Sequence, residues 1–204
     1  MWSWIADFAA LVGQNPGLAT LVAFTAAIVE AVAVLGILIP GTPILMAVAG
    51  AAAMAGLPMT PIIVVAIAGA VIGDFISFWL GQRFSTHLRG IWPFRTRPNL
   101  IGQAEAFFYR YGIMSVALCR FVPVLRSTVP LVAGMAGMRR RRFLLANVSS
   151  AFVWAPAHVL PAQFAGLSIE RFSQGDWPSA VYAATGLMAL MVAGWYIHRL
   201  ARGR

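Results

Sequence analysis

The sequence predicts an all-α integral membrane protein, with about four transmembrane helices and two opposed re-entrant helical hairpins that form an inverted repeat. Composition is the first observation behind this fold class: 60% of the 204 residues are hydrophobic and 10% are charged, whereas soluble domains carry about 25% charged residues. The second is a set of apolar windows, centred near residues 25, 72, 155 and 189, that meet or approach the ~20 residues a helix needs to cross a bilayer. The third is that proline interrupts two of the apolar stretches.

The N-terminal residues 1–14 are expected to form a short interfacial helix, because apolar side chains recur there on one helical face. A membrane core over residues 15–168 follows. Residues 169–204 are expected to contain a last transmembrane helix, over about 179–198, and a basic tail. We therefore expect one compact membrane domain.

The core begins with an almost continuously apolar run over residues 18–57, which the segment IPGTP interrupts. Two prolines and a glycine in this segment break helical hydrogen bonding, with Pro40 and Gly41 at the centre of the break. A straight span through the segment is therefore not expected. We instead expect a first crossing over about 15–32 and a re-entrant hairpin over about 33–57.

Further along the chain, residues 62–81 form a cleaner span, interrupted by Asp74. An arginine-bearing loop and an amphipathic helix, AEAFFYRYG, are expected after it. Another crossing is expected over about 143–167.

Basic residues flank the apolar stretch 113–138 on both sides. Five arginines precede it within residues 82–112, and four follow it at 139–142. Short cytoplasmic loops carry the excess of arginine, so a single crossing would leave one basic flank on the outer side. A re-entrant hairpin removes this conflict and places both termini in the cytoplasm. The residues expected to break this hairpin are Pro123, Pro130 and Gly134.

The two predicted hairpins resemble each other in sequence. VAVLGILIP at 32–40 aligns with SVALCRFVP at 115–123, and AVAG at 47–50 aligns with LVAG at 131–134 after a slip of one residue. Opposite orientation together with similar sequence is typical of an inverted repeat, in which paired broken segments meet near the membrane midplane and form the substrate site.

Four ionisable residues are expected at membrane depth, namely Glu30, Asp74, Arg120 and Arg126. Each buried charge costs roughly 2.5–3.5 kcal/mol on insertion scales, so such charges usually face one another or a cavity. Two interpretations stay open. The charges can form a structural network of salt bridges that holds the hairpins together. Alternatively, they line a polar cavity where guanidinium groups bind an anion and a carboxylate carries a proton. Glu30 is the better candidate for this carboxylate, and Asp74 is the second.

These motifs, in this order, resemble the DedA family of membrane proteins, which is also known for its VTT or SNARE-associated-type domain. The resemblance covers about residues 20–165. It lies in Glu30, PGTP, Gly73-Asp74 with Phe78 and Gly81, RFVPVLRSTVPLVAGMAGM, and then Phe143, Asn147 and Trp154. The Arg-Phe-x-Pro-x-x-Arg segment is its most distinctive part.

The resemblance implies a multi-pass protein of the bacterial inner membrane that moves lipids between leaflets. In bacterial members the implied substrate is polyprenyl (undecaprenyl) phosphate, with proton coupling, whereas eukaryotic relatives act as phospholipid scramblases. Glu30, Arg120 and Arg126 match the family's essential charges. Many members have an acid directly after Pro-Gly, where this chain has Thr42. Either Asp74 supplies the second acid or Thr42 serves only as a hydroxyl ligand. The substrate-binding candidates are Arg120, Arg126, Thr42 and Asn147.

Other functional classes are weighed against this hypothesis. A phospholipid scramblase and an ion or proton transporter with structural arginines are the alternatives. An enzyme acting on lipid phosphates is not expected, because the sequence has no Ser-His-Asp arrangement, metal-binding acid cluster or cysteine nucleophile with a base. We expect no metal, cofactor or nucleic acid, since anionic lipid headgroups are the better counter-charge for a net charge of +9. Exposed small-residue faces allow a homodimer.

Overall fold

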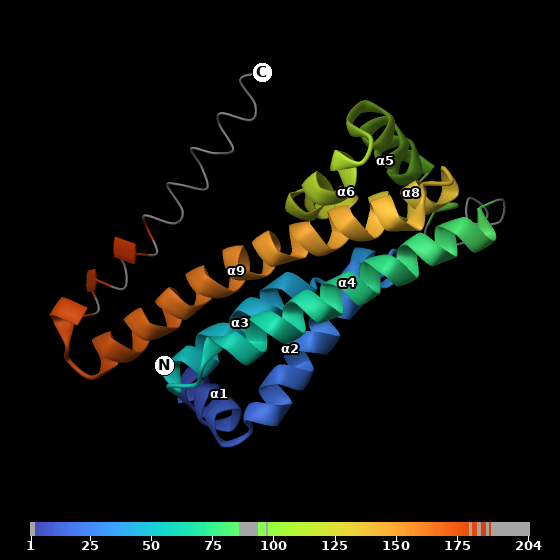
Figure 1. Cartoon of the computed structure of the whole chain (residues 1–204). Coiled ribbons are helices and arrows are strands. Elements are labelled where there is room, and N and C mark those ends of the chain that lie inside the picture. Colours follow the sequence, from blue (N-terminus) through green and yellow to red (C-terminus); the bar gives the residue numbers. More distant parts are fainter. Residues whose placement is uncertain are drawn as a thin grey trace.

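A computed structural model describes residues 3–85, 94–96, 98–179, 181–182, 185–186 and 188 of the chain. The described part is all-helical, which confirms the predicted α class (Figure 1). The predicted last crossing and the basic tail lie largely outside the described residues.

The fold is built around two long helices, α4 (Met59–Phe84) and α9 (Arg140–Ser173). At about 1.5 Å rise per residue, both exceed the ~30 Å thickness of the hydrocarbon core. Within the described ranges, these two helices are the ones that are long and apolar enough to cross a membrane. They pack against each other and extend through the molecule in Figure 1. The predicted spans over 62–81 and 143–167 are therefore helices, whereas the count of about four crossings stays a prediction.

The first predicted break separates two short helices, α2 (Pro16–Ala31) and α3 (Gly41–Met54), which pack against each other. Between them lies a 3-10 turn, η1 (Leu35–Ile37). Pro40 has an extended backbone, and α3 begins directly after it. The first helix of this pair, α2, is the segment predicted as a separate first crossing. The predicted hairpin 33–57 therefore contains only the second helix of the pair, α3. Re-entry into the membrane stays a prediction.

The second predicted break divides the stretch 113–138 into four short pieces, so this stretch is not a continuous rod. They are α6 (Met114–Leu118), η3 (Cys119–Phe121), α7 (Pro123–Arg126) and α8 (Thr128–Met135).

Of the residues predicted to break this hairpin, only Pro123 starts a helix directly after an extended residue, Val122. Pro130 lies in the first turn of α8, where a missing N–H removes no intrahelical hydrogen bond. Gly134 lies near the other end of α8, inside the helix. The helical segments are therefore separated at the extended Val122 and at Ser127, instead of at Pro130 and Gly134.

Glycines allow the short helices to approach the long ones closely. A Cβ atom on Gly81 of α4 would lie 2.0 Å from the carbonyl oxygen of Leu131 in α8, and one on Gly134 would lie 2.1 Å from that of Phe78. On the other side of the fold, a Cβ atom on Gly166 of α9 would lie 2.2 Å from the carbonyl oxygen of Gly50 in α3. Such contacts are typical of membrane helix interfaces.

The packing exchanges partners between the two halves of the chain. The helix that follows the first break, α3, packs mainly on α9, and the helix that follows the second break, α8, packs mainly on α4. Gly50 and Gly134, which end the two aligned sequence segments AVAG and LVAG, both lie at these crossings. The similarity of the two segments therefore has a counterpart in their packing.

Two amphipathic helices complete the described fold. The N-terminal helix α1 (Ser3–Gln14) packs on α3, and α5 (Pro98–Tyr111) packs on α8. Both were predicted as helices, and the interfacial position of α1 stays a prediction.

Candidate functional site

The first part of the site joins both broken segments through Arg126, at the end of α7. Its Nη1 lies 3.0 Å from Oε1 of Glu30, in the last turn of α2. The same nitrogen donates a hydrogen bond of 2.9 Å to the hydroxyl of Thr42, in the first turn of α3. The Thr42 hydroxyl lies 2.7 Å from each carboxylate oxygen of Glu30. Acid, hydroxyl and guanidinium thus form a closed triangle.

Two glycines make this triangle possible. A Cβ atom on Gly41 would lie 2.8 Å from Cβ of Glu30, so the start of α3 can approach the end of α2 only without a side chain there. A Cβ atom on Gly36 would lie 2.0 Å from the carbonyl oxygen of Glu30 and 3.1 Å from Cβ of Ser127. Gly36 belongs to the first break and Ser127 to the second, so the two breaks meet at this point.

The second part of the site surrounds Arg120, in η3. Its Nη2 lies 2.6 Å from Oδ2 of Asp74, in the middle of α4, and both side chains are almost fully buried. Nε donates a hydrogen bond of 2.9 Å to the hydroxyl of Ser150. Nη2 also donates to the side-chain and backbone oxygens of Asn147. The Asn147 amide nitrogen in turn donates to the backbone oxygen of Val71, 3.1 Å away. This network ties η3 to both long helices.

Trp154 of α9 connects the two parts. Its ring centroid lies 4.0 Å from Cζ of Arg126 and 6.0 Å from Cζ of Arg120. The indole is fully buried. A tryptophan face attracts a cation by up to about 2 kcal/mol when the pair is desolvated, so the ring stabilises two like charges in one site.

Arg126 retains hydrogen-bonding capacity that its protein partners do not use. In the part of the chain that the structure describes, its Nε and Nη2 have no hydrogen-bond partner, and the same holds for Nη1 of Arg120 and Oδ1 of Asp74. Nε and Nη2 form the side edge of the guanidinium, which can donate two parallel hydrogen bonds to one oxyanion group. Buried donors without partners cost about 1–3 kcal/mol each. The site therefore has buried guanidinium donors that are free to bind an anion.

Exposure distinguishes the two acids. The Asp74 side chain is 2% exposed, whereas that of Glu30 is 15% exposed. Formal charges cancel within each pair, so the cluster as a whole is neutral.

The structure thus brings together all six residues predicted for binding or coupling: Glu30, Thr42, Asp74, Arg120, Arg126 and Asn147. Pro40 and Gly41 adjoin this cluster through the start of α3, and Pro123 through the start of α7. Ser150 was missed by the sequence reasoning. Its signal was its position three residues after Asn147, on the same face of a helix.

The family model described as the VTT domain matches residues 39–164. The chain is 33% identical to the inner membrane protein YabI of Escherichia coli over 86% of this chain and 70% of that protein. It is 35% identical to an uncharacterized membrane protein of Mycobacterium tuberculosis over 73% of this chain and 72% of that protein. An uncharacterized membrane protein of Synechocystis is 32% identical over 76% and 74%. No solved structure matches the chain.

Proposed function

Because this chain belongs to the VTT-domain family, the DedA membrane proteins of bacteria, we propose that it is a translocase that moves a lipid phosphate between membrane leaflets. The proposed substrate is polyprenyl phosphate, with undecaprenyl phosphate as the bacterial form. The protein does no covalent chemistry on the lipid in this scheme. The polar head of the lipid passes through the charged cluster while the hydrocarbon tail stays in the membrane.

The observation that supports this proposal best is the unused edge of Arg126. The residue is 4% exposed, its Nη1 is held by Glu30 and Thr42, and its Nε and Nη2 have no partner among the described residues. Two of the terminal oxygens of a phosphate monoester can lie in the plane of this edge and accept both hydrogen bonds. A purely structural ion pair needs only one edge of the guanidinium.

Charge balance suggests how transport is coupled to protons. The four buried charges cancel, so a bound phosphate adds negative charge at membrane depth, where uncompensated charge is costly. Protonation of Glu30 compensates for this charge and also releases Nη1 of Arg126. Glu30 is the more accessible acid, and we therefore assign it the coupling role. Asp74 is the second candidate, and Thr42 and Asn147 orient the arginines.

The direct test is translocation of a fluorescent polyprenyl phosphate in proteoliposomes. Loss of two charge-assisted hydrogen bonds worth about 1.5–3 kcal/mol each predicts that Arg126→Ala reduces the rate by roughly a hundredfold or more. Arg126→Lys keeps the charge but loses the paired N–H groups of the guanidinium. Its translocation rate is expected to lie between those of the wild type and Arg126→Ala. Arg171→Ala is the matched control, since Arg171 is half exposed and lies 3.6 Å from Asp176 outside the cluster. Undiminished transport by folded Arg126→Ala overturns the proposal.

An ion or proton transporter is the second candidate, and it is favoured by the fact that both arginines already have acidic partners. Proton flux in liposomes that contain only zwitterionic lipid separates the two functions. Flux without lipid movement supports the ion transporter. A phospholipid scramblase differs again, because it moves phosphodiester lipids as fast as phosphate monoesters. Release of inorganic phosphate from the substrate would instead indicate an enzyme.

Orientation and assembly complete the proposal. Both termini are placed in the cytoplasm, because arginine-rich segments border the membrane segments on that side. Reporter fusions at each terminus test this orientation. The exposed small-residue faces are compatible with a homodimer, which cross-linking in native membranes tests.

A further inference from the structure

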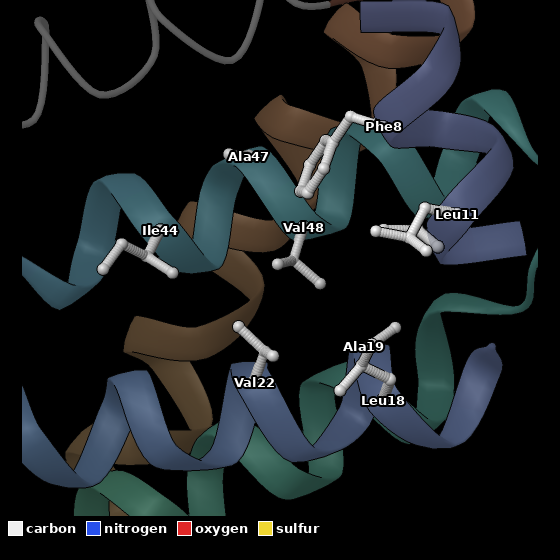
Figure 2. A pocket seen from close by; sticks show the side chains of 9 residues that line it. Phe8, Leu11, Leu18, Ala19, Val22, Ile44, Ala47 and Val48 are labelled. Atoms are coloured by element: carbon white, nitrogen blue, oxygen red, sulfur yellow. The ribbon is translucent and has the colours of Figure 1, made fainter. Parts of the chain in front are cut away.

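The structure holds a hollow between α1, α2 and α3, away from the charged cluster (Figure 2). Its volume is about 330 Å³, within the ~300–1,000 Å³ typical of small-molecule pockets. Every side chain that lines it is apolar: Phe8, Leu11, Val12, Leu18, Ala19, Val22, Ile44, Ala47 and Val48. We refer to this hollow as the apolar groove.

The groove is open at the surface and has a buried floor. Leu11 and Leu18 at its edges are 49% and 46% exposed, whereas Ala19 and Val48 are each 3% exposed. Figure 2 shows Val22 and Val48 facing each other across the hollow, with Phe8 and Leu11 of α1 above it. The predicted position of α2 and α3 in the membrane opens this groove to hydrocarbon, so the contents that match it are aliphatic.

The contact seam between α2 and α3 has the charged cluster at one end and the groove at the other. On α2, Leu18 and Val22 line the groove. Glu30 lies eight residues after Val22, about two helical turns further along the same face. On α3, Gly41 and Ile44 share a face. At the cluster end the seam is closed, because a Cβ atom on Gly41 would lie 2.8 Å from Cβ of Glu30. At the other end it widens into the groove.

We propose that the apolar groove binds the hydrocarbon tail of the lipid whose phosphate head is bound by Arg126. The inference rests on the proposed function and extends it to the tail of the substrate. Thr42 and Val48 lie six residues apart on α3, or about 9 Å at 1.5 Å per residue. A head at the Thr42 end therefore places the first carbons of its tail at the groove. A protein helix, about 10 Å wide with its side chains, is a poorer match for so small a volume than a single aliphatic chain.

The groove is tested with a defined probe, a C15 prenyl phosphate that carries a diazirine in its tail, and the purified full chain in nanodiscs. Photolysis is expected to label peptides from α2 and α3 that contain Leu18–Val22 and Ile44–Val48. Excess unlabelled C15 prenyl phosphate is expected to displace this labelling. Labelling that spreads evenly over α4 and α9 and is not displaced overturns the groove.

A filling substitution gives the matched comparison. Ala47 is an exposed groove residue, so Ala47→Trp fills the hollow with little cost to folding. Groove labelling is expected to fall at least tenfold. Ala157→Trp adds the same volume at an exposed alanine of α9, outside the groove, and is expected to leave the labelling unchanged. Equal labelling of both variants overturns the proposal.

Tail length gives an independent readout. Each methylene buried in an apolar site adds about 0.8 kcal/mol, or nearly fourfold in affinity. Wild-type affinity is therefore expected to rise steeply from C5 to C15 prenyl phosphate, and the rise is expected to flatten in Ala47→Trp. Leu11→Gln, which makes the groove polar without filling it, is expected to flatten the rise as well. A rise that persists in both folded variants contradicts the inference.

The two proposals fail in distinguishable ways. A groove that labels specifically in a protein without translocation activity overturns the proposed function and leaves the tail site in place. Translocation that depends on Arg126 but is insensitive to Ala47→Trp keeps the function and overturns the tail site.

Discussion

Arg126 and Glu30 form an ion pair of 3.0 Å across the point where the two broken segments meet. Arg126 ends α7, within the second break, and Glu30 lies in the last turn of α2, before the first. The Thr42 hydroxyl lies within hydrogen-bonding distance of both. The pair therefore links the two halves of the chain through an arginine that also has free capacity to bind an anion.

Replacement of Thr42 by valine is expected to weaken this link. The isosteric side chain removes the hydroxyl that donates to Glu30 and accepts from Arg126, and each lost hydrogen bond to a charged group is worth about 1.5–3 kcal/mol. We expect a lower midpoint of unfolding in SDS titration and slower translocation. Thr42→Ser keeps the hydroxyl and is expected to behave like the wild type. Equal stability of the two variants would show that the hydroxyl contributes nothing.

Replacement of Asp74 by asparagine is expected to destabilise the protein more strongly. The change leaves the Arg120 charge buried with no carboxylate, which typically costs about 3–5 kcal/mol. Replacement of both partners, in Asp74→Leu with Arg120→Met, is expected to recover much of this loss because no uncompensated charge remains. Reversible unfolding of both variants in detergent measures the difference. A double variant no more stable than Asp74→Asn would contradict a simple ion pair.

Trp154 is expected to hold Arg126 in place through its ring. Trp154→Leu removes the face that lies 4.0 Å from the guanidinium and is expected to reduce translocation several-fold, in line with about 1–2 kcal/mol for a desolvated cation–π contact. Trp154→Phe retains an aromatic face and is expected to keep more of the activity. Transport rates normalised to the folded fraction separate this effect from the cavity that either change creates. Equal rates for the two variants would exclude a role for the ring.

The crossing of α4 and α8 is expected to tolerate no side chain at Gly81. A Cβ atom there would lie 2.0 Å from the Leu131 carbonyl oxygen, so Gly81→Ala is expected to cost about 1–3 kcal/mol by overpacking. Gly102→Ala is the control, since nothing lies within 4 Å of a Cβ atom at this helical position. It is expected to be neutral or to stabilise by up to about 1 kcal/mol through helix propensity. Thermal unfolding of both variants in the same detergent tests the contrast.

Local patterns were sufficient for several features of this protein. Predominantly apolar runs over 62–81 and 143–167 predicted the two long helices, which span 59–84 and 140–173, since about twenty apolar residues have few alternatives to a helix. Pro40 and Pro123 marked the ends of extended turns, because proline fixes its own backbone and restricts the residue before it. The cost of buried charge predicted that the four ionisable residues would face one another or a shared cavity.

Pairing and packing could not be predicted in the same way. The sequence left open which arginine pairs with which acid, because either arginine could compensate the charge of either acid. It also suggested that Pro130 and Gly134 interrupt a helix, whereas α8 continues through both positions. Proline in a first turn loses no hydrogen bond, and Gly134 serves the approach to α4. Such outcomes depend on where a residue stands relative to its neighbours in space.

The sequence by itself determined an all-helical membrane chain with two breaks and four buried charges, because hydrophobic length, proline geometry and the cost of desolvation act locally. Only the tertiary structure decided that Arg126 binds Glu30 and Thr42 while Arg120 binds Asp74, and that the seam between α2 and α3 widens into an apolar groove. Contacts between distant segments depend on how closely those segments approach. Gly36, Gly41 and Gly81 permit this approach, because a side chain at these positions would clash with a neighbouring backbone or side chain.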